Sequence, residues 1–356
     1  MDRTSDPTQP EPGQSRPPTM KDIAVSAGVA QSTVSRILSG SPLAIAVAPS
    51  TRERVEQVAQ AMGYRPNPAA RALRGAKTML LGVIIPDVAD PFFFTVALQA
   101  VTLAARARGY NVGLGLADSS TTSGEGREVA SVLEARHCDA LIVLGDVNAQ
   151  PRLVEDLRAS RVRLVGIWQH TLLDDVYAVN ADNSAGIRQA VKHLRKLGHQ
   201  RIAFISSAPG RDVGEREETY RSLVPGMPGG FVQHVPNTPA GGVAALRKLL
   251  ALDDRPTAIV AATDLVALGV LHEAYEADLH IPRDLSLIGF DDIPVAAYAV
   301  PALTTLRMPT SAMVDAAVSL ATAETVPERG KPRLFRPKLV VRSSTGPVPP
   351  PQDSAV

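Results

Sequence analysis

The spacing of hydrophobic residues changes near position 77 of this chain. Before it, apolar residues recur three or four positions apart, as they do along one face of a helix. Beyond it, they gather in short continuous runs that are typical of strands buried on both faces, and amphipathic helices separate these runs. The pattern therefore predicts a small all-α domain followed by a larger α/β domain.

The helical part begins with two short helices separated by a glycine. Thr19 can cap the first helix, with Asp22 at the third helical position, and Ile23 and Ala27 share a face. Gly28 then permits a sharp turn. A second apolar stripe follows at Val29, Val34, Ile37 and Leu38. Two short helices around a glycine turn predict a helix-turn-helix.

A third helix is expected from Pro49 to Met62. Proline suits the first helical position, and Gly63 follows the last residue of the apolar stripe. The prolines within 64–68 break any helix, and a short Ala-rich segment at 69–74 comes next.

The α/β part is long enough for two lobes. Strand-like runs occur at 80–85, 140–144, 164–167, 201–205, 258–261 and 285–288, and helices are expected at 92–108, 184–197, 242–250 and 265–277. About ten βα units in about 265 residues exceed one compact sheet and suit two doubly wound parallel sheets with a cleft between them. Ligands of such sheets bind at the carboxyl ends of the strands.

Charge is unevenly distributed, although the formal net charge of the whole chain is only +1. Residues 19–77 contain eight Lys or Arg and three acidic residues, a net of +5, so the remainder is slightly negative. A compact basic segment on such a body is typical of a phosphate-binding head, although an ordinary solvated face gives the same count.

Several classes of protein find no support in the sequence. The single Cys138 leaves no disulfide or zinc-binding spacing, so we expect a cytoplasmic protein without metal or cofactor. Nothing near the N-terminus resembles a signal peptide, and no apolar run is long enough to span a membrane. Residues 1–18 and 346–356 are poor in large apolar side chains, and we expect both to be disordered tails.

Several motifs together resemble the LacI/GalR family of repressors over residues 19 to about 345. The longest is Thr19-Met20-Lys21-Asp22-Ile23-Ala24 with Ala27-Gly28-Val29 and Ser32-Thr33-Val34-Ser35-Arg36, and others lie at 51–55, 63–67, 90–93, 193–199 and 287–292. The resemblance implies a helix-turn-helix at 19–66, a hinge helix at 67–76, and at 77–345 a two-lobed effector domain similar to periplasmic sugar-binding proteins. It also implies a homodimer that binds palindromic operator DNA and a small effector.

The resemblance assigns roles in DNA binding. Gln31, Ser32 and Arg36 fall where a recognition helix reads base edges in the major groove. Leu73, in the hinge, would wedge into the minor groove, or alternatively would pack against the core. The other predicted DNA-contacting residues are Thr19, Thr33, Ser35, Tyr64, Asn67 and Ala70.

The head departs from the family pattern. Ala30 and Ala48 stand where a capping serine is usual, which costs about 1 kcal/mol each, and the loop at 40–48 is about three residues longer.

The effector site that the resemblance implies comprises Asp90, Phe92, Trp168, Arg216, Thr263 and Asp291. Polar groups between aromatic walls suit a sugar, although Phe92 can equally belong to the lobe core. Asp90 and Thr263 stand where Asn is frequent, and Trp168 stands where Asp is frequent. An acceptor-only Asp90 favours hydroxyl-rich or cationic ligands.

Other functions are weighed against this one. An enzyme on the same scaffold lacks support because G-x-S-x-G, P-loop and metal motifs are absent, and His193 and His199 fit structural roles. A pure solute-binding protein would have no basic head. Within the family, a repressor released by a sugar-like inducer and a regulator that needs a co-repressor, such as a purine or a phosphoprotein, are both compatible with the sequence.

Overall fold

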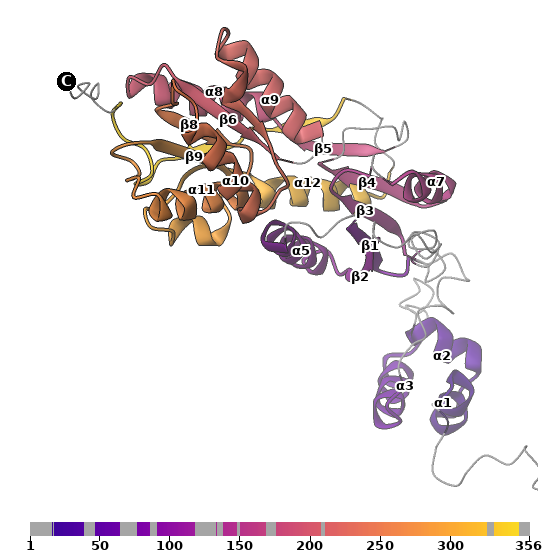
Figure 1. Ribbon diagram of the computed structural model, residues 1–356. Helices are drawn as coiled ribbons and strands as arrows, with labels where there is room; N and C mark the ends of the chain where they lie inside the picture. The colour runs from indigo at the N-terminus through magenta and orange to yellow at the C-terminus, as the bar shows by residue number, and fades with distance from the viewer. Residues whose placement is uncertain are drawn as a thin grey trace, which may run out of the picture. The chain divides into compact units, whose positions relative to one another are not determined.

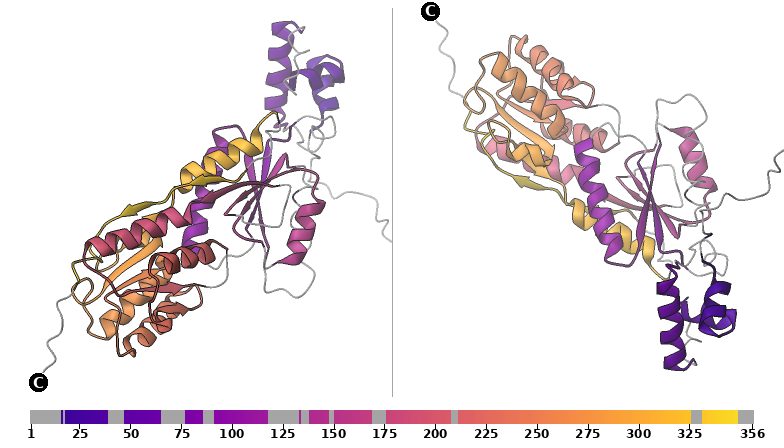
Figure 2. Two further views of the ribbon diagram at one scale, coloured as in Figure 1. Left: turned by 90° about the horizontal axis from the view of Figure 1, so that it is seen from above. Right: turned by 90° about the horizontal axis from the view of Figure 1, so that it is seen from below.

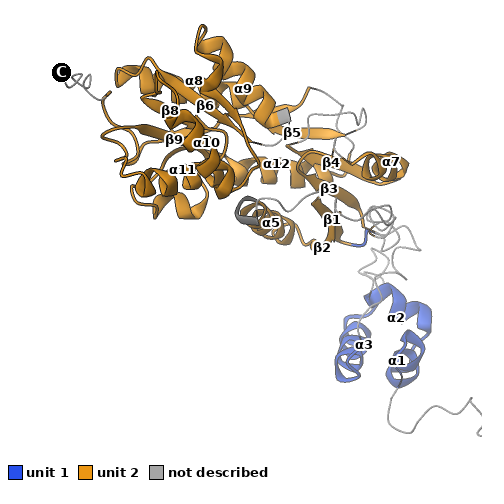
Figure 3. Cartoon of the chain, in the orientation of Figure 1, with its two compact units in different colours: residues 1–78 blue, residues 79–356 orange. Residues whose placement is uncertain are grey.

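The computed structural model describes residues 16, 18–38, 47–64, 77–85, 91–117, 133, 138–147, 150–168, 176–207, 211–325 and 331–348, apart from the side chains of 91–93 and 211. The chain divides into two compact units, residues 1–78 and residues 79–356 (Figures 1 and 3). The expected hinge helix at 67–76 lies outside the described residues.

The first unit contains the helices α1 (Met20–Ala27), α2 (Gln31–Leu38) and α3 (Pro49–Ala61). Its small core consists of Ile23, Ala24, Ala27, Val34, Ile37, Val55 and Ala59. Gly28 ends α1 in the left-handed conformation, with φ 64°. The three predicted helices are therefore confirmed, and the third ends one residue earlier than expected.

The first lobe of the second unit is a parallel sheet with the strand order β11-β5-β4-β3-β1-β2. Its strands are β1 (Leu80–Ile85), β2 (Asn111–Leu116), β3 (Ala140–Leu144), β4 (Arg163–Ile167), β5 (Tyr177–Ala181) and β11 (Arg333–Phe335), and its helices are α5 (Pro91–Arg106), α7 (Pro151–Ala159) and α12 (Thr310–Thr322). The helices α5 and α12 pack side by side (Figure 2).

The second lobe repeats this order as β12-β10-β9-β8-β6-β7, with β12 antiparallel. Its strands are β6 (Ile202–Ser206), β7 (Val232–His234), β8 (Ala258–Ala261), β9 (Ser286–Asp291), β10 (Thr304–Arg307) and β12 (Lys338–Val340). Its helices are α8 (Asn183–Lys196), α9 (Arg211–Leu223), η3 (Gly229–Phe231), α10 (Pro239–Leu250), α11 (Asp264–Glu276) and η4 (Pro294–Ala297). The predicted two-lobed, doubly wound fold is confirmed.

The chain passes between the lobes after β5, after β10, and between β11 and β12. The strands β3, β6 and β8 are wholly buried, which explains why they read as unbroken apolar runs. Because parallel strands end at the same edge, β6, β8 and β9 of the second lobe present their C-terminal residues together.

The expectation of a disordered tail at 346–356 is wrong for residues 346–348. Gly346 donates its N–H to Ser286 Oγ at 3.0 Å, and the N–H of Val348 donates to Leu197 O at 2.9 Å. These backbone hydrogen bonds hold 346–348 on the second lobe, which a composition rich in proline does not reveal.

Candidate functional site

The start of the head is fixed by a reciprocal cap. Thr19 Oγ1 accepts from the N–H of Asp22 at 3.4 Å, and Asp22 Oδ2 accepts from the N–H of Thr19 at 2.8 Å. The hydrogen bonds from the side chain and backbone of Thr19 lower the pKa of Asp22. The predicted cap on α1 is confirmed, whereas Ala48 provides no side-chain cap for α3.

The helix α2 is amphipathic, and the predicted base-reading residues lie away from its buried face. Val34 and Ile37 face the core, while Gln31, Ser32 and Arg36 are exposed. An exposed polar face backed by a packed core is what insertion into a major groove requires. Of the other predicted contacts, Thr19 is exposed, Thr33, Ser35 and Tyr64 are half-buried, and Asn67, Ala70 and Leu73 lie outside the described residues.

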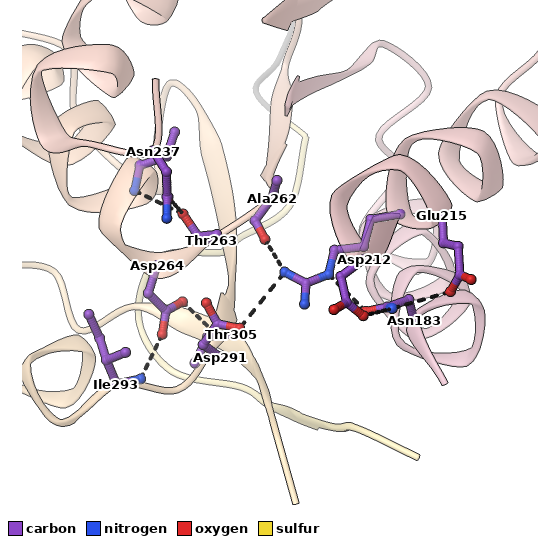
Figure 4. A network of polar contacts seen from close by, with 12 residues as sticks. Asn183, Asp212, Glu215, Asn237, Ala262, Thr263, Asp264, Asp291, Ile293 and Thr305 are labelled. Atoms are coloured by element: carbon purple, nitrogen blue, oxygen red, sulfur yellow. Dashed lines mark hydrogen bonds and ion pairs between the residues drawn. The ribbon is translucent and has the colours of Figure 1, made fainter. Parts of the chain in front are cut away.

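Arg216 of α9 is the centre of a polar network in the second lobe, and Figure 4 labels its partners Asn183, Ala262 and Asp291. Its Nε donates to Asn183 Oδ1 at 2.9 Å, and its Nη1 donates to Ala262 O at 2.6 Å. Nη1 also lies 3.8 Å from Asp291 Oδ1, and the guanidinium stacks 3.6 Å over the ring of Phe290. The remaining nitrogen, Nη2, makes no hydrogen bond within the described part of the chain.

Thr263 and Asp291 lie at the ends of neighbouring strands in this network. Thr263 follows β8, caps α11 by accepting from the N–H of Val266, and donates to Asn237 Oδ1 at 2.7 Å. Asp291 ends β9 with φ 113°, an unfavourable conformation for a residue with a side chain. The structure places Arg216 3.8 Å from Asp291 and joins it to the carbonyl of Ala262, the residue before Thr263. The role of these three residues in effector binding, which the resemblance implied, stays a prediction.

The first-lobe residues of the predicted site are described only in part. Asp90 and the side chain of Phe92 lie outside the described residues. Trp168 follows β4, is 3% exposed, and packs in the apolar core, and its backbone N–H donates to Val179 O.

Sequence analysis missed several members of the network. Asn183, which begins α8, donates through Nδ2 to Asp212 and to Glu215 on α9. Asp264, the first residue of α11, is fully buried, and burial raises its pKa to about 7. An acidic residue directly after a strand and a capping threonine was the available signal for Asp264. Nothing local marks Asn183 or Asn237.

His193 and His199, for which the sequence indicated structural roles, both have hydrogen-bond partners within the second lobe. His199 is buried, with Nδ1 3.0 Å from Thr257 Oγ1 and Nε2 3.0 Å from Gly346 O, and burial lowers its pKa. His193 Nε2 lies 3.0 Å from Thr345 Oγ1. Among the described residues there is no group of three or more His, Cys, Asp or Glu arranged to hold a metal ion. None of the described helices is long and apolar enough to span a membrane.

Comparison with known proteins agrees with both parts of the chain. Residues 19–67 match the model for bacterial regulatory proteins of the lacI family, and residues 191–345 match the periplasmic binding protein-like domain. The HTH-type transcriptional regulator MalR of Streptomyces coelicolor is 33% identical over 93% of this chain and 97% of its own length. The chain belongs to the LacI family.

Solved structures of similar regulators share this fold. The transcriptional regulator CelR in complex with cellobiose superposes with a TM-score of 0.64 and 29% identity, covering 92% of this chain and 99% of that one. A lac repressor dimer bound to operator and the anti-inducer ONPF gives a TM-score of 0.76 at 24% identity, covering 93% and 100%, and shows the fold alone. This LacI-family chain is therefore a DNA-binding transcription regulator, as predicted.

Proposed function

We propose that this LacI-family regulator is a repressor whose affinity for operator DNA is set by a small hydroxyl-rich effector bound between the lobes. Arg216 carries the proposal. It is buried, its Nε and Nη1 are held by protein oxygens, and Nη2 is left to donate to a ligand oxygen. The proposed effector contacts are Arg216, Thr263 and Asp291 of the second lobe and Asp90, Phe92 and Trp168 of the first.

A neutral sugar suits this network better than an anion. Asp291 is an acceptor for a hydroxyl, and its charge already partly balances that of Arg216 across 3.8 Å. A phosphate or carboxylate would bring a further negative charge close to Asp291. The cellobiose complex of CelR supports a carbohydrate effector for a regulator of this fold.

In the head, we assign base reading to the exposed face of α2. Gln31, Ser32 and Arg36 are the proposed base contacts, and their exposure opposite Val34 and Ile37 supports this role. The functional boundaries that we propose are 19–66 for the head, 67–76 for the hinge and 77–345 for the effector domain. The proposed role involves no catalysis.

The working form that we propose is a cytoplasmic homodimer, because a palindromic operator requires two heads. Both lobes expose large apolar side chains that a second copy could cover. Leu114 and Leu116 lie on β2 at the sheet edge, and Tyr298 and Val300 of the second lobe are 85% and 92% exposed.

The effector proposal is tested by screening neutral mono- and disaccharides, cellobiose included, for a shift in the thermal unfolding of the full-length protein. A compound that stabilises the wild type is then titrated into Arg216→Gln and Asp291→Ala, with Arg221→Gln as the control on the same helix. Both site variants are expected to lose the response while keeping operator affinity, and Arg221→Gln is expected to keep both. A site variant that still responds, or a folded Asp291→Ala that no longer binds operator, contradicts the assignment.

A further inference from the structure

A fully buried carboxylate, that of Asp264, lies beside the proposed effector site. Asp264 begins α11, and its Oδ1 accepts from Thr305 Oγ1 at 2.5 Å, while its Oδ2 accepts from the N–H of Ile293 at 2.9 Å. No ion pair joins Asp264 to a cation among the described residues. Its partners are instead hydrogen-bond donors on two other segments, so the carboxylate connects α11, the turn after β9, and β10 (Figure 4).

The turn after β9 needs such a connection. Asp291 and Asp292 have φ values of 113° and 60°, and non-glycine residues keep such conformations only where their surroundings hold them. Gly289 leaves room for the holding group, because a Cβ at this position would overlap Asp264 Oδ1. The turn thus depends on a side chain that is contributed from a different element.

The same turn also contacts the segment that leads into the other lobe. The N–H of Met308, directly after β10, donates to Asp291 O at 3.3 Å. Thr305, the partner of Asp264, lies three residues before Met308, and the chain enters α12 of the first lobe at Thr310.

We propose that Asp264 is the positioning residue of the effector site, which fixes the turn that presents Asp291 to Arg216 and ties that turn to the strand leading into the other lobe. The proposal rests on the proposed role of Asp291 in effector binding. Asp264 acts entirely through Asp291 and touches no ligand itself.

Asparagine is the informative substitution. Its Oδ1 can accept from the N–H of Ile293, and its Nδ2 can donate to Thr305 Oγ1, which reverses the direction of that hydrogen bond. A protonated Asp264 would make the same pair of contacts. Asp264→Asn is therefore expected to hold the turn, whereas Asp264→Ala removes both contacts and leaves the buried N–H of Ile293 without its partner.

The test is amide hydrogen exchange of the full-length protein, followed in a peptide that covers 291–293 and in one that covers β3. Asp284→Ala is the control, because Asp284 also accepts a backbone N–H, that of His280, elsewhere in the second lobe. In Asp264→Ala the turn is expected to exchange roughly tenfold faster while β3 is unchanged, since the N–H of Ile293, which lies in the turn peptide, loses its hydrogen-bond partner. Asp264→Asn and Asp284→Ala are expected to keep wild-type exchange at the turn.

The proposal is overturned if the turn of Asp264→Ala exchanges at the wild-type rate. It is also overturned if the turn exchanges as fast in Asp264→Asn as in Asp264→Ala. Should Asp264→Ala not fold, Thr305→Val removes one donor at nearly constant volume and is expected to loosen the same peptide. A crystal structure of the loosened variant is expected to show Asp291 moved away from Arg216, and an unchanged 3.8 Å separation contradicts the proposal. None of these measurements needs an effector. If the exchange results agree with the proposal but the wild type binds no sugar, the proposed effector is wrong and the role of Asp264 in holding the turn still stands.

Discussion

The two lobes share a strand order but carry opposite chemistry at the same place. β4 and β9 are each the fourth strand from the edge formed by β2 or β7. The residue after β4 is Trp168, the residue after β9 is Asp292, and both have φ 60°. Trp168 packs in an apolar core, whereas Asp292 is held by ion pairs to Arg307 and Arg342.

The difference shows that one backbone turn can be stabilised in two ways. In the first lobe, burial of a large ring offsets the unfavourable φ. In the second lobe, charged side chains hold the turn, and Asp291 stands beside them with its carboxylate near Arg216. The two turns thus differ in chemistry, with a buried aromatic ring in the first lobe and charged side chains in the second.

The largest expected effect comes from removing the buried ring of Trp168 at the turn after β4. Trp168→Ala removes a ring that is 3% exposed and is expected to lower the unfolding free energy by about 3–5 kcal/mol. Urea unfolding followed by circular dichroism measures this change, and Trp168→Phe, which keeps a ring, is the control. If Trp168→Ala lowers the unfolding free energy no more than Trp168→Phe does, burial of the ring does not hold the turn.

The charged lobe is expected to respond to pH through Asp264. Burial raises its pKa to about 7, above the unfolded value, so its contribution to stability is complete below about pH 4 and is lost as the pH rises through 7. Asp264→Asn does not ionise, and its advantage over the wild type is expected to grow between pH 4 and 7.5, up to about 4 kcal/mol.

Urea unfolding followed by the fluorescence of Trp168, the only tryptophan, measures this advantage. The lowered pKa of His199 makes both proteins less stable as the pH falls below about 6.5, so its effect cancels in the comparison. A difference between the two proteins that does not change with pH would contradict the account of Asp264.

The two ion pairs of Asp292 are expected to differ in strength because they differ in burial. The side chain of Arg342 is 17% exposed and that of Arg307 is 57% exposed. Arg342→Met is therefore expected to lower the unfolding free energy by about 2–3 kcal/mol, and Arg307→Met by less than about 1 kcal/mol. Chemical unfolding of both variants at low salt checks the order, and equal losses would mean that burial does not decide the strength of these pairs.

The smallest expected effects concern the N-terminal ends of the helices α1 and α3, of which only α1 has a side-chain cap. Thr19→Ala removes the reciprocal cap of α1 and is expected to destabilise that helix by about 1 kcal/mol. Ala48→Ser adds a cap where none exists, and it is expected to stabilise α3 by a similar amount. Hydrogen exchange of the two helices in the full-length protein measures both changes. Faster exchange of α3 in Ala48→Ser would contradict the interpretation.

Local patterns predicted the fold class and six of the twelve described strands. The apolar runs predicted β1, β3, β4, β6, β8 and β9, because a strand that is buried on both faces has apolar residues at successive positions. The strands β2, β5, β7, β10, β11 and β12 were not predicted. Of these, β7, β11 and β12 span only three residues each, and none of those residues is buried. Short edge strands depend on pairing with a neighbour, which no local pattern encodes.

The candidate site was predictable only in part, for the same reason. Arg216 and Asp291 are among the predicted site residues, and the structure places them 3.8 Å apart, while Thr263 follows Ala262, whose carbonyl accepts from Arg216. Asn183 and Asn237 come from separate helix and loop positions, and only the folded sheet makes them neighbours of this set. Asp264 looked like an ordinary helix start because its partners lie about 30 to 40 residues further along the chain.

The most direct test of the central claim is fluorescence anisotropy with a duplex from the region upstream of the protein's own gene and a scrambled duplex, titrated with salt. The wild type is expected to prefer the first duplex, with an affinity that falls steeply as salt rises. Gln31→Ala is expected to reduce that preference roughly tenfold, while Gln60→Ala, an exposed change on α3, leaves it intact. Equal binding of both duplexes by the wild type, or an unchanged preference in Gln31→Ala, would contradict the account of α2 as the element that reads DNA.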